Sequence, residues 1–311
     1  MLKLLNISRF KWFIFSFFPA FFYFNSTAFA NEKIAVGYFK QGKYIVSKGT
    51  KTPTGYIFNK NSNKTIKLST LDWPPYIGQN LCNKGWGFNF TVALLVSKGY
   101  QVKIDFLPWA RAVRSVEFGI SDILFPEYYI EYSAPSDYVK DKRRREILML
   151  SNEFPGGMIG FLKRKGETDK FKGNLHNLKG EAIGVVRGYQ NTPEFDIMMD
   201  NGEFNIVQAV DDLQLVKLLV AKRVNLIIGD PIVLRFTVNY SDLPAPEKAK
   251  LLNSIEQVKP EIQYNALYYA LSVKNKNAHE ILKDINTALN EFKNSGETQR
   301  IIDMGNSECL L

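Results

Sequence analysis

The chain has 311 residues, of which 45% are hydrophobic and 23% are charged, so it is long enough to bury the core of one large or two smaller domains. This composition excludes a disordered chain, a collagen-like chain and a disulfide-dense scaffold. The net charge is +9, but basic residues cluster only at 140–145, which does not indicate a nucleic-acid-binding protein. With two cysteines and two histidines, we expect no metal site and no cofactor.

Residues 1–30 have the pattern of a cleavable secretory signal. Three positive charges precede the apolar run Trp12–Phe24, and small residues stand at Ala28 and Ala30. A membrane anchor is the alternative, but a run of thirteen residues is too short to span about 30 Å of hydrocarbon. We therefore expect a soluble periplasmic protein without a lipid anchor, whose net charge is +6 once the signal is removed.

An oxidising compartment makes Cys82 and Cys309 candidates for a disulfide. Two unpaired thiols are equally compatible with the sequence, because spacing along the chain does not give the distance between the sulfur atoms.

The mature chain is predicted to be an α/β protein. Residues 31–65 look like an N-terminal appendage, with strands at Ile34–Phe39 and Tyr44–Val46 around a turn. From Ile66 onward strands alternate with helices, which favours α/β lobes with largely parallel sheets. Strands are expected at 66–71, 102–107, 122–125, 158–163, 182–186, 205–208, 226–228 and 268–273, and helices at 88–97, 109–117, 193–200, 212–221 and 278–292.

The order of these elements predicts that the chain crosses twice between two lobes. The strand and amphipathic helix at 266–311 would return to the first lobe, 66–154, after the second lobe, 155–265. We expect the crossings near Pro155 and Asn265.

The first candidate binding segment is Asp72-Trp73-Pro74-Pro75-Tyr76, directly after the first predicted lobe strand. The prolines end the strand, so Trp73 and Tyr76 are expected at its carboxyl end, where open α/β sheets bind ligands. Alternatively the two rings only close the edge of the lobe.

A second candidate, Trp109 with Arg111, opens the helix after the next strand. A guanidinium beside an indole suits a carboxylate or a flat ligand, although Arg111 could equally form a surface ion pair.

Two further candidates lie in the second half of the chain. The turn Arg187-Gly188-Tyr189 follows a strand, and its amides could face an anion. Asp230 follows another strand and precedes Pro231, so it could accept a hydrogen bond from an ammonium or only cap the next helix.

From about Ile66 to Ile302 these segments resemble the family 3 extracytoplasmic solute-binding proteins of polar amino acid ABC importers. They are most similar to a subgroup that carries five recurring motifs. These stand here at Asp72–Tyr76 (DWPPY), Pro108–Ala112 (PWARA), Asp122–Tyr129, Leu178–Tyr189 and Tyr268–Lys274.

The resemblance implies a bilobed type II periplasmic-binding-protein fold with a two-segment hinge. It also implies an aspartate for the ligand's α-ammonium, which Asp230 matches, and places Tyr128 in the ligand set. The family's carboxylate-binding arginine stands six residues before an aromatic-serine pair. Taking Leu150-Ser151 as that pair gives Arg144, at the cost of an insertion near 130–141, whereas Tyr132-Ser133 puts Pro126 there instead.

The function implied is capture of a small polar ligand, an amino acid or related zwitterion, for delivery to an ABC-type permease. We expect a monomer with no catalytic residues and no nucleic-acid partner. Two alternatives stay open: a dehydratase-like enzyme that uses Glu127, Glu131 or Glu153, and a ligand sensor for a separate membrane partner.

Overall fold

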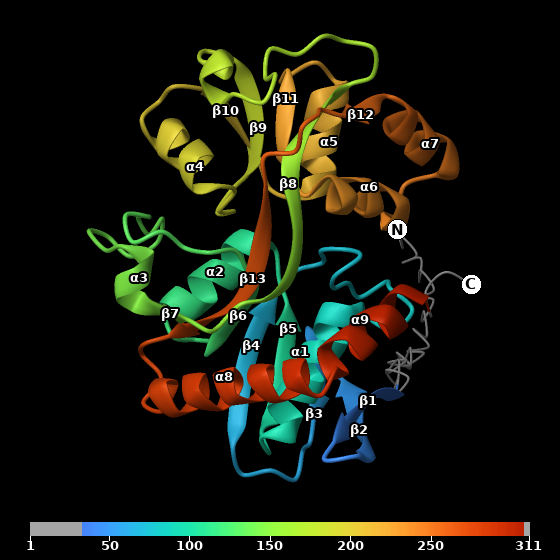
Figure 1. Ribbon diagram of the computed structural model, residues 1–311, viewed down its shortest axis with the longest axis vertical. Helices are drawn as coiled ribbons and strands as arrows, with labels where there is room; N and C mark the ends of the chain where they lie inside the picture. Colours follow the sequence, from blue (N-terminus) through green and yellow to red (C-terminus); the bar gives the residue numbers. More distant parts are fainter. Residues whose placement is uncertain (1–32, 308–311) are drawn as a thin grey trace, which may run out of the picture. The chain divides into compact units, whose positions relative to one another are not determined.

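The computed structural model describes residues 33–307, which fold into two α/β lobes (Figure 1). This confirms the predicted bilobed α/β class. The predicted signal, residues 1–30, and Cys309 lie outside the described residues. Within the described range, no helix is both long enough and apolar enough to cross a membrane.

The first lobe is built on a mixed sheet whose central strands are parallel. Its strands are β1 (Lys33–Lys40), β2 (Lys43–Lys51), β3 (Gly55–Phe58), β4 (Thr65–Thr70), β5 (Gln101–Phe106), β6 (Ile123–Glu127), β7 (Leu148–Leu150) and part of β13 (Gln263–Ser272). Strand β4 lies between β5 and β6 and is parallel to both, whereas β13 pairs antiparallel with β6. The loops that follow β4, β5 and β6 therefore leave from the same edge of the sheet.

Helices cover this sheet, and the most apolar of them is the most deeply placed. They are α1 (Trp86–Ser97), α2 (Trp109–Glu117), α3 (Arg144–Ile147), α8 (Ala278–Asn294) and α9 (Glu297–Ser307). Helix α1 is apolar around most of its circumference because it packs against β1, β5, α8 and α9. Helix α8 buries the single apolar face predicted for it, including Ile281, Ile285 and Phe292.

The N-terminal segment forms the hairpin predicted for it, β1 paired with β2. The segment continues into β3, which pairs antiparallel with β5 and so extends the sheet of the first lobe. Val36, Tyr38, Tyr56 and Phe58 join the main core, and Tyr56 and Phe58 contact Phe88 of α1 edge-on. Residues 33–58 are thus part of the sheet and core of this lobe.

The second lobe contains a smaller sheet with helices on its faces. Its elements are the distal part of β8 (Phe154–Arg164), η1 (Leu175–Leu178), β9 (Ala182–Val186), α4 (Pro193–Asp200), β10 (Asn205–Ala209), α5 (Asp212–Val220), β11 (Leu226–Gly229), α6 (Pro231–Tyr240), α7 (Ala245–Asn253) and β12 (Ile255–Gln257). Strand β9 is parallel to its neighbours β10 and β11, and β8 is antiparallel to β11. Thr192 caps α4 through the amide of Phe195, with Pro193 in the first turn, as the sequence predicts.

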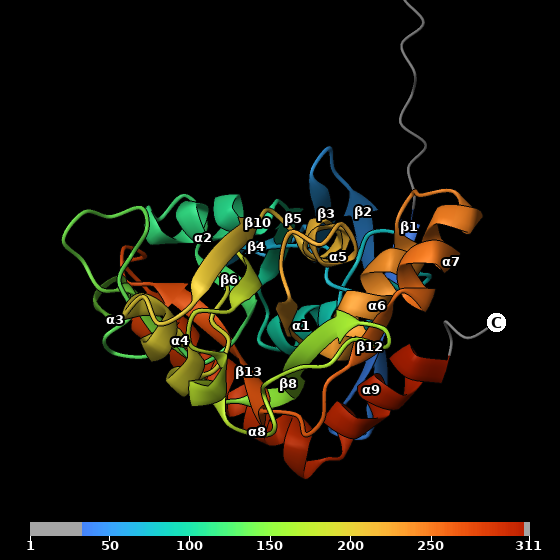
Figure 2. The ribbon, with the colours of Figure 1, turned by 90° about the horizontal axis from the view of Figure 1, so that it is seen from above.

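Two strands connect the lobes. β8 and β13 pair antiparallel, with Asn265 opposite Gly157 and Leu267 opposite Phe154. Both views show the two strands side by side (Figure 2). Farther along, β8 pairs with β11 of the second lobe and β13 pairs with β6 and β7 of the first. The predicted crossings near Pro155 and Asn265 lie on these two strands.

Candidate functional site

The loop after β4 is held by its own hydrogen bonds. Trp73 and Ile77 exchange backbone hydrogen bonds of 2.7 and 3.1 Å. The Asp72 carboxylate accepts from the Gln79 amide at 2.6 Å and from the Gln79 side chain at 3.1 Å. Asp72 is exposed, so its role in this arrangement is to hold the loop that presents the two aromatic rings.

Those rings form a buried aromatic cluster. Trp73 stacks on Tyr76 with 4.7 Å between ring centroids and meets Tyr128 edge-on at 5.7 Å. All three are buried, and Tyr128 follows β6 directly. The cluster therefore joins the ends of two neighbouring parallel strands, as the position of the predicted motif indicates.

Asp230 connects this cluster to the second lobe. Its carboxylate accepts a hydrogen bond of 2.7 Å from the Tyr76 hydroxyl and also caps α6 through the amides of Ile232 and Val233. The helix-capping role proposed for Asp230 is thus confirmed, and a second partner comes from the other lobe. Burial raises the pKa of Asp230, and the hydrogen bonds from Tyr76 and the two amides oppose that rise.

A second contact between the lobes runs from α2 to the Gly188 turn. The Trp109 indole nitrogen donates to the Gly188 carbonyl at 2.9 Å, and the Tyr189 ring meets the indole edge-on at 5.8 Å. Gly188 has a φ of 84°, a left-handed conformation that glycine adopts without strain.

Two amides of this turn are already bonded within the second lobe, so these two are not available for the anion site that the sequence suggested. The amide of Arg187 donates to Ala209, and the amide of Tyr189 donates to Val186. The polar group that the turn offers to the first lobe is therefore a carbonyl. The Arg187 side chain is exposed at the edge of a cavity.

Asp212, at the start of α5, is a site residue that sequence reasoning missed. Asp211 occupies the capping position and accepts from the Gln214 amide, so Asp212 is free to turn inward. The buried Asp212 carboxylate accepts a hydrogen bond of 2.8 Å from the Tyr189 hydroxyl. Burial raises the pKa of Asp212 to about 7, with a smaller contribution from Asp211 and Asp230. The consecutive pair Asp211-Asp212 was the available signal, since one helix needs only one such cap.

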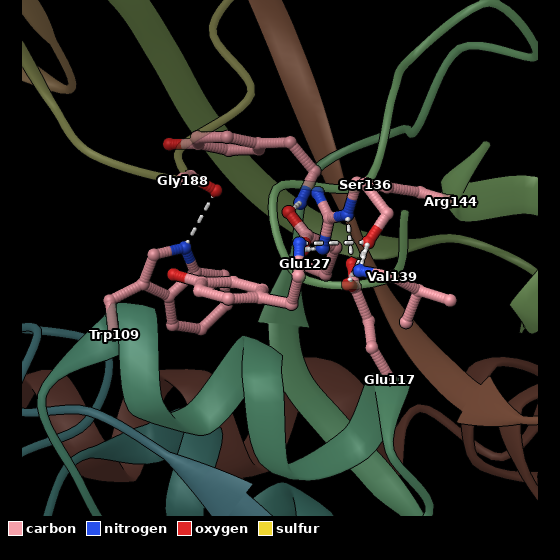
Figure 3. Close-up of polar contacts among 9 residues, drawn as sticks. Trp109, Glu117, Glu127, Ser136, Val139, Arg144 and Gly188 are labelled. Carbon is pink, nitrogen blue, oxygen red and sulfur yellow. Dashed lines mark hydrogen bonds and ion pairs between the residues drawn. The ribbon is translucent and has the colours of Figure 1, made fainter. Parts of the chain in front are cut away.

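Arg144 is placed differently from the expected carboxylate-binding arginine. Its guanidinium donates to Glu117 at 3.0 Å and to Glu127 at 2.8 Å (Figure 3). Arg144, Glu117 and Glu127 are only 4%, 0% and 2% exposed. Glu117 ends α2 and Glu127 ends β6, so the guanidinium of Arg144 joins its own helix α3 to the ends of two earlier elements of the first lobe.

The same cluster fixes the loop that precedes α3. The Ser136 hydroxyl donates to Glu117 at 2.5 Å and accepts from the Val139 amide at 2.8 Å (Figure 3). Of the three consecutive arginines, only Arg144 is buried, while Arg145 lies over the Tyr132 ring. The basic run is thus split between a buried ion-pair cluster and an outer surface.

Arg111 stands apart from the aromatic cluster. It is exposed on α2, two residues after the buried Trp109. Residues two apart on a helix do not share a face, so the expected pairing of guanidinium and indole is not formed.

Two adjoining cavities lie at the contact between the lobes. The inner one, of about 20 Å³, is lined by Trp73, Trp109, Tyr128 and Tyr189 among others. The second, of about 150 Å³, is lined by groups that include Arg144 and Arg187. Tyr189 and Gln190 line both cavities, so the two spaces adjoin.

Several remaining predictions concern chemistry outside this site. Cys82 is exposed, and its pairing with Cys309 stays a prediction because Cys309 lies outside the described residues. Among residues 33–307, no group of three or more His, Cys, Asp or Glu side chains is arranged to hold a metal ion.

The fold resembles that of solved binding proteins and of a sensor domain. An ancestral arginine-binding protein bound to arginine has a TM-score of 0.60 at 18% identity, over 78% of this chain and 98% of that one. An amino acid ABC transporter substrate-binding protein from Streptococcus pneumoniae bound to L-arginine has a TM-score of 0.56 at 17% identity, over 78% of this chain and 94% of that one. A histidine kinase sensor domain with similarity to periplasmic binding proteins has a TM-score of 0.58 at 17% identity, over 80% of this chain and 97% of that one.

No protein-family model and no curated protein matches the sequence. The similarity to these solved structures shows that the chain has the same bilobed fold.

Proposed function

We propose that this chain is an extracytoplasmic solute-binding protein that captures a small polar ligand between its lobes and delivers it to an ABC-type permease. The observation that carries the proposal is the contact between the lobes, where Tyr76 meets Asp230 and Trp109 meets Gly188 around buried aromatic rings. The solved binding proteins with this fold support the proposal, because two of those compared were solved with arginine bound.

The mechanism follows from the two connecting strands. Bending of β8 and β13 separates the lobes and gives a solute access to the aromatic cluster, and closure then removes the solute from water. The Tyr76 hydroxyl and the Asp230 carboxylate form part of the closed contact. A charged group on the ligand that binds between them gains the strength of a hydrogen bond to an ionised partner.

Catalysis is not part of this proposal. Glu127, one of the acids considered for a dehydratase-like enzyme, is buried and accepts from Arg144, which favours a fixed structural role. A sensor role remains the second candidate, because a histidine kinase sensor domain shares the fold.

The test is thermal unfolding of the purified protein with a panel of amino acids, amines, small carboxylates and sugars. A ligand at 100 times its Kd stabilises a protein by about 2.7 kcal/mol, which raises the Tm of a chain this long by roughly 2–4 °C. We expect one class of solute to do so, and Asp230→Asn to reduce the shift. A ligand-free protein that no solute stabilises would contradict the proposal.

Transport and sensing are separated in cells. Loss of uptake of the identified solute on deletion of the gene indicates a transporter component. A change in gene expression with uptake intact indicates a sensor.

A further inference from the structure

Negative charge is in excess at the contact between the lobes. Four buried carboxylates lie there, and the buried cation among them is Arg144. They are Glu117, Glu127, Asp212 and Asp230. Arg144 is already bound to the first two. Asp212 and Asp230 are instead hydrogen-bonded to hydroxyls and backbone amides. A buried carboxylate that is held only by neutral groups favours a positively charged ligand.

Tyr128 provides an independent sign of a ligand at this point. Its side chain is 6% exposed, and its hydroxyl has no hydrogen-bond partner among residues 33–307. The Tyr128 ring packs against Trp73, which stacks on Tyr76, the hydrogen-bond partner of Asp230. Tyr128 also lines the same cavity as Tyr189, the hydrogen-bond partner of Asp212. A buried hydroxyl without a partner destabilises the folded protein, and its oxygen can accept a hydrogen bond from an ammonium.

We propose that the ligand is an amine cation, whose ammonium is bound by Asp212, Asp230 and the Tyr128 hydroxyl, and that its recognition requires no carboxylate. This inference rests on the proposed solute-binding function and names the class of solute. The rings of Trp73 and Trp109 line a cavity together with Tyr128 and Tyr189, and such rings suit both an alkyl chain and a cation.

The position of Arg144 argues against a bound carboxylate. A ligand carboxylate that paired with this guanidinium would displace Glu117 or Glu127 and leave a buried charge without its partner. The amides of Arg187 and Tyr189 offer no substitute, because they are bonded within the second lobe.

The adjoining 150 Å³ cavity favours a ligand with a second cationic end. Its lining carries five carboxyl groups against two arginines. Burial, with smaller contributions from the charges of Asp200 and Glu127, raises the pKa of one of these groups, Asp196, to about 7 against the hydrogen bonds from Asn191. Because Tyr189 and Gln190 line both spaces, a flexible chain can extend from the inner site into this cavity. Diamines and guanidino amines fit this description.

The decisive experiment compares each amine with the amino acid that differs from it by one carboxylate. Titration calorimetry of the purified protein with agmatine against arginine, and with cadaverine against lysine, measures the contribution of that group directly. We expect the amine to bind at least as tightly in both pairs. Tighter binding of the amino acid would overturn the inference and leave the proposed function standing. Absence of binding by any solute in the wider panel would overturn both.

A pair of tyrosine variants tests the placement of the ammonium. Tyr128→Phe removes the unpartnered hydroxyl, so the ligand-free protein should be at least as stable while its affinity for the preferred amine falls about 5-fold or more. The matched control is Tyr269→Phe, because the buried Tyr269 hydroxyl is hydrogen-bonded to Thr91 at 2.9 Å in the core. This control should lose stability and keep its affinity for the amine. Unchanged amine binding by Tyr128→Phe would overturn the assignment of its hydroxyl.

Discussion

The two groups of buried charge at the contact between the lobes differ in how they are balanced. Around Arg144, a guanidinium, two carboxylates and a serine hydroxyl bind one another. Around Asp212 and Asp230, two carboxylates are held by tyrosine hydroxyls and helix amides, beside a hydroxyl without a partner. The ion pairs of Arg144 therefore stabilise the folded protein, whereas a ligand is expected at Asp212 and Asp230.

The largest expected effect on stability comes from removing Arg144 from its two ion pairs. Arg144→Ala leaves Glu117 and Glu127 buried without their cation, and such a loss costs about 3–5 kcal/mol of the free energy of unfolding. The control is the exposed neighbour, Arg143→Ala, which should change stability by less than about 0.5 kcal/mol. Urea unfolding measures both. A stable Arg144→Ala protein that has lost its ligand would instead assign this arginine to ligand binding.

The burial of Asp212 predicts that the free energy of unfolding falls as the pH rises, which is the opposite of the effect of a salt-bridged acid. The pKa of Asp212 is about 7 in the folded protein, against 3.8 ordinarily, because the carboxyl is buried and the charges of Asp211 and Asp230 add to this effect. Hydrogen bonds from the Tyr189 hydroxyl and from a backbone amide oppose it. Between these values the folded state holds a proton that the unfolded chain has released. The ligand-free protein should therefore lose stability as the pH rises from about 4 to 7, by on the order of 1–4 kcal/mol.

Unfolding curves at several pH values check this prediction. Asp212→Asn should make the slope shallower, and the remaining slope is expected from Asp196, whose pKa is also raised to about 7. An equally steep slope in this variant would contradict the assignment to Asp212. A bound cation should also reduce the slope, since it stabilises the ionised carboxylate.

A smaller effect is expected from the strand that passes beneath the contact. A Cβ at Gly157 would lie 2.2 Å from both the Asp230 carboxylate and the Tyr76 hydroxyl, so Gly157→Ala should separate this pair. A hydrogen bond to a charged group contributes about 1.5–3 kcal/mol, which corresponds to a loss of roughly 10- to 100-fold in ligand affinity. The control is Gly160→Ala on the same strand, where the nearest atom would be 3.5 Å away. Equal affinity of the two variants would show that this contact does not contribute to closure.

The smallest effect concerns a neutral contact between the lobes. Trp109→Phe keeps an aromatic ring but removes the indole donor to Gly188. A neutral hydrogen bond contributes about 0.5–1.5 kcal/mol, so ligand affinity should fall roughly 2- to 10-fold. A larger loss than that of Gly157→Ala would mean that the indole contacts the ligand itself.

The sequence predicts most of the fold because the pattern of strands and helices is local. Helix α2 and strand β9 have the predicted bounds, and the Thr192 cap is where the Thr-Pro pair places it. Helices α6, α7 and α9 and strand β3 were not predicted. That β3 extends the lobe's sheet depends on a distant partner, β5, which no local pattern reveals.

The sequence predicts some site residues well and others poorly, again because it shows local patterns and not distant contacts. Trp73, Tyr76 and Asp230 follow strand ends, so their position is encoded locally. The environment of Arg144 depends on Glu117 and Glu127, which approach it only in the folded chain. A sequence gives the number of charged side chains, but their burial and pairing in the folded protein decide which of them is available to a ligand.

The irregular pairing of β13 bears on how the lobes can move. Its ladder shifts register between Asn265 and Leu267, where it pairs with β8, and again between Tyr268 and Ala270, where it pairs with β6. Such bulges interrupt the ladder and let a strand bend without loss of its remaining hydrogen bonds. In the proposed opening of the lobes, bending at these two places would involve only a few peptide units and would leave the sheet of each lobe intact.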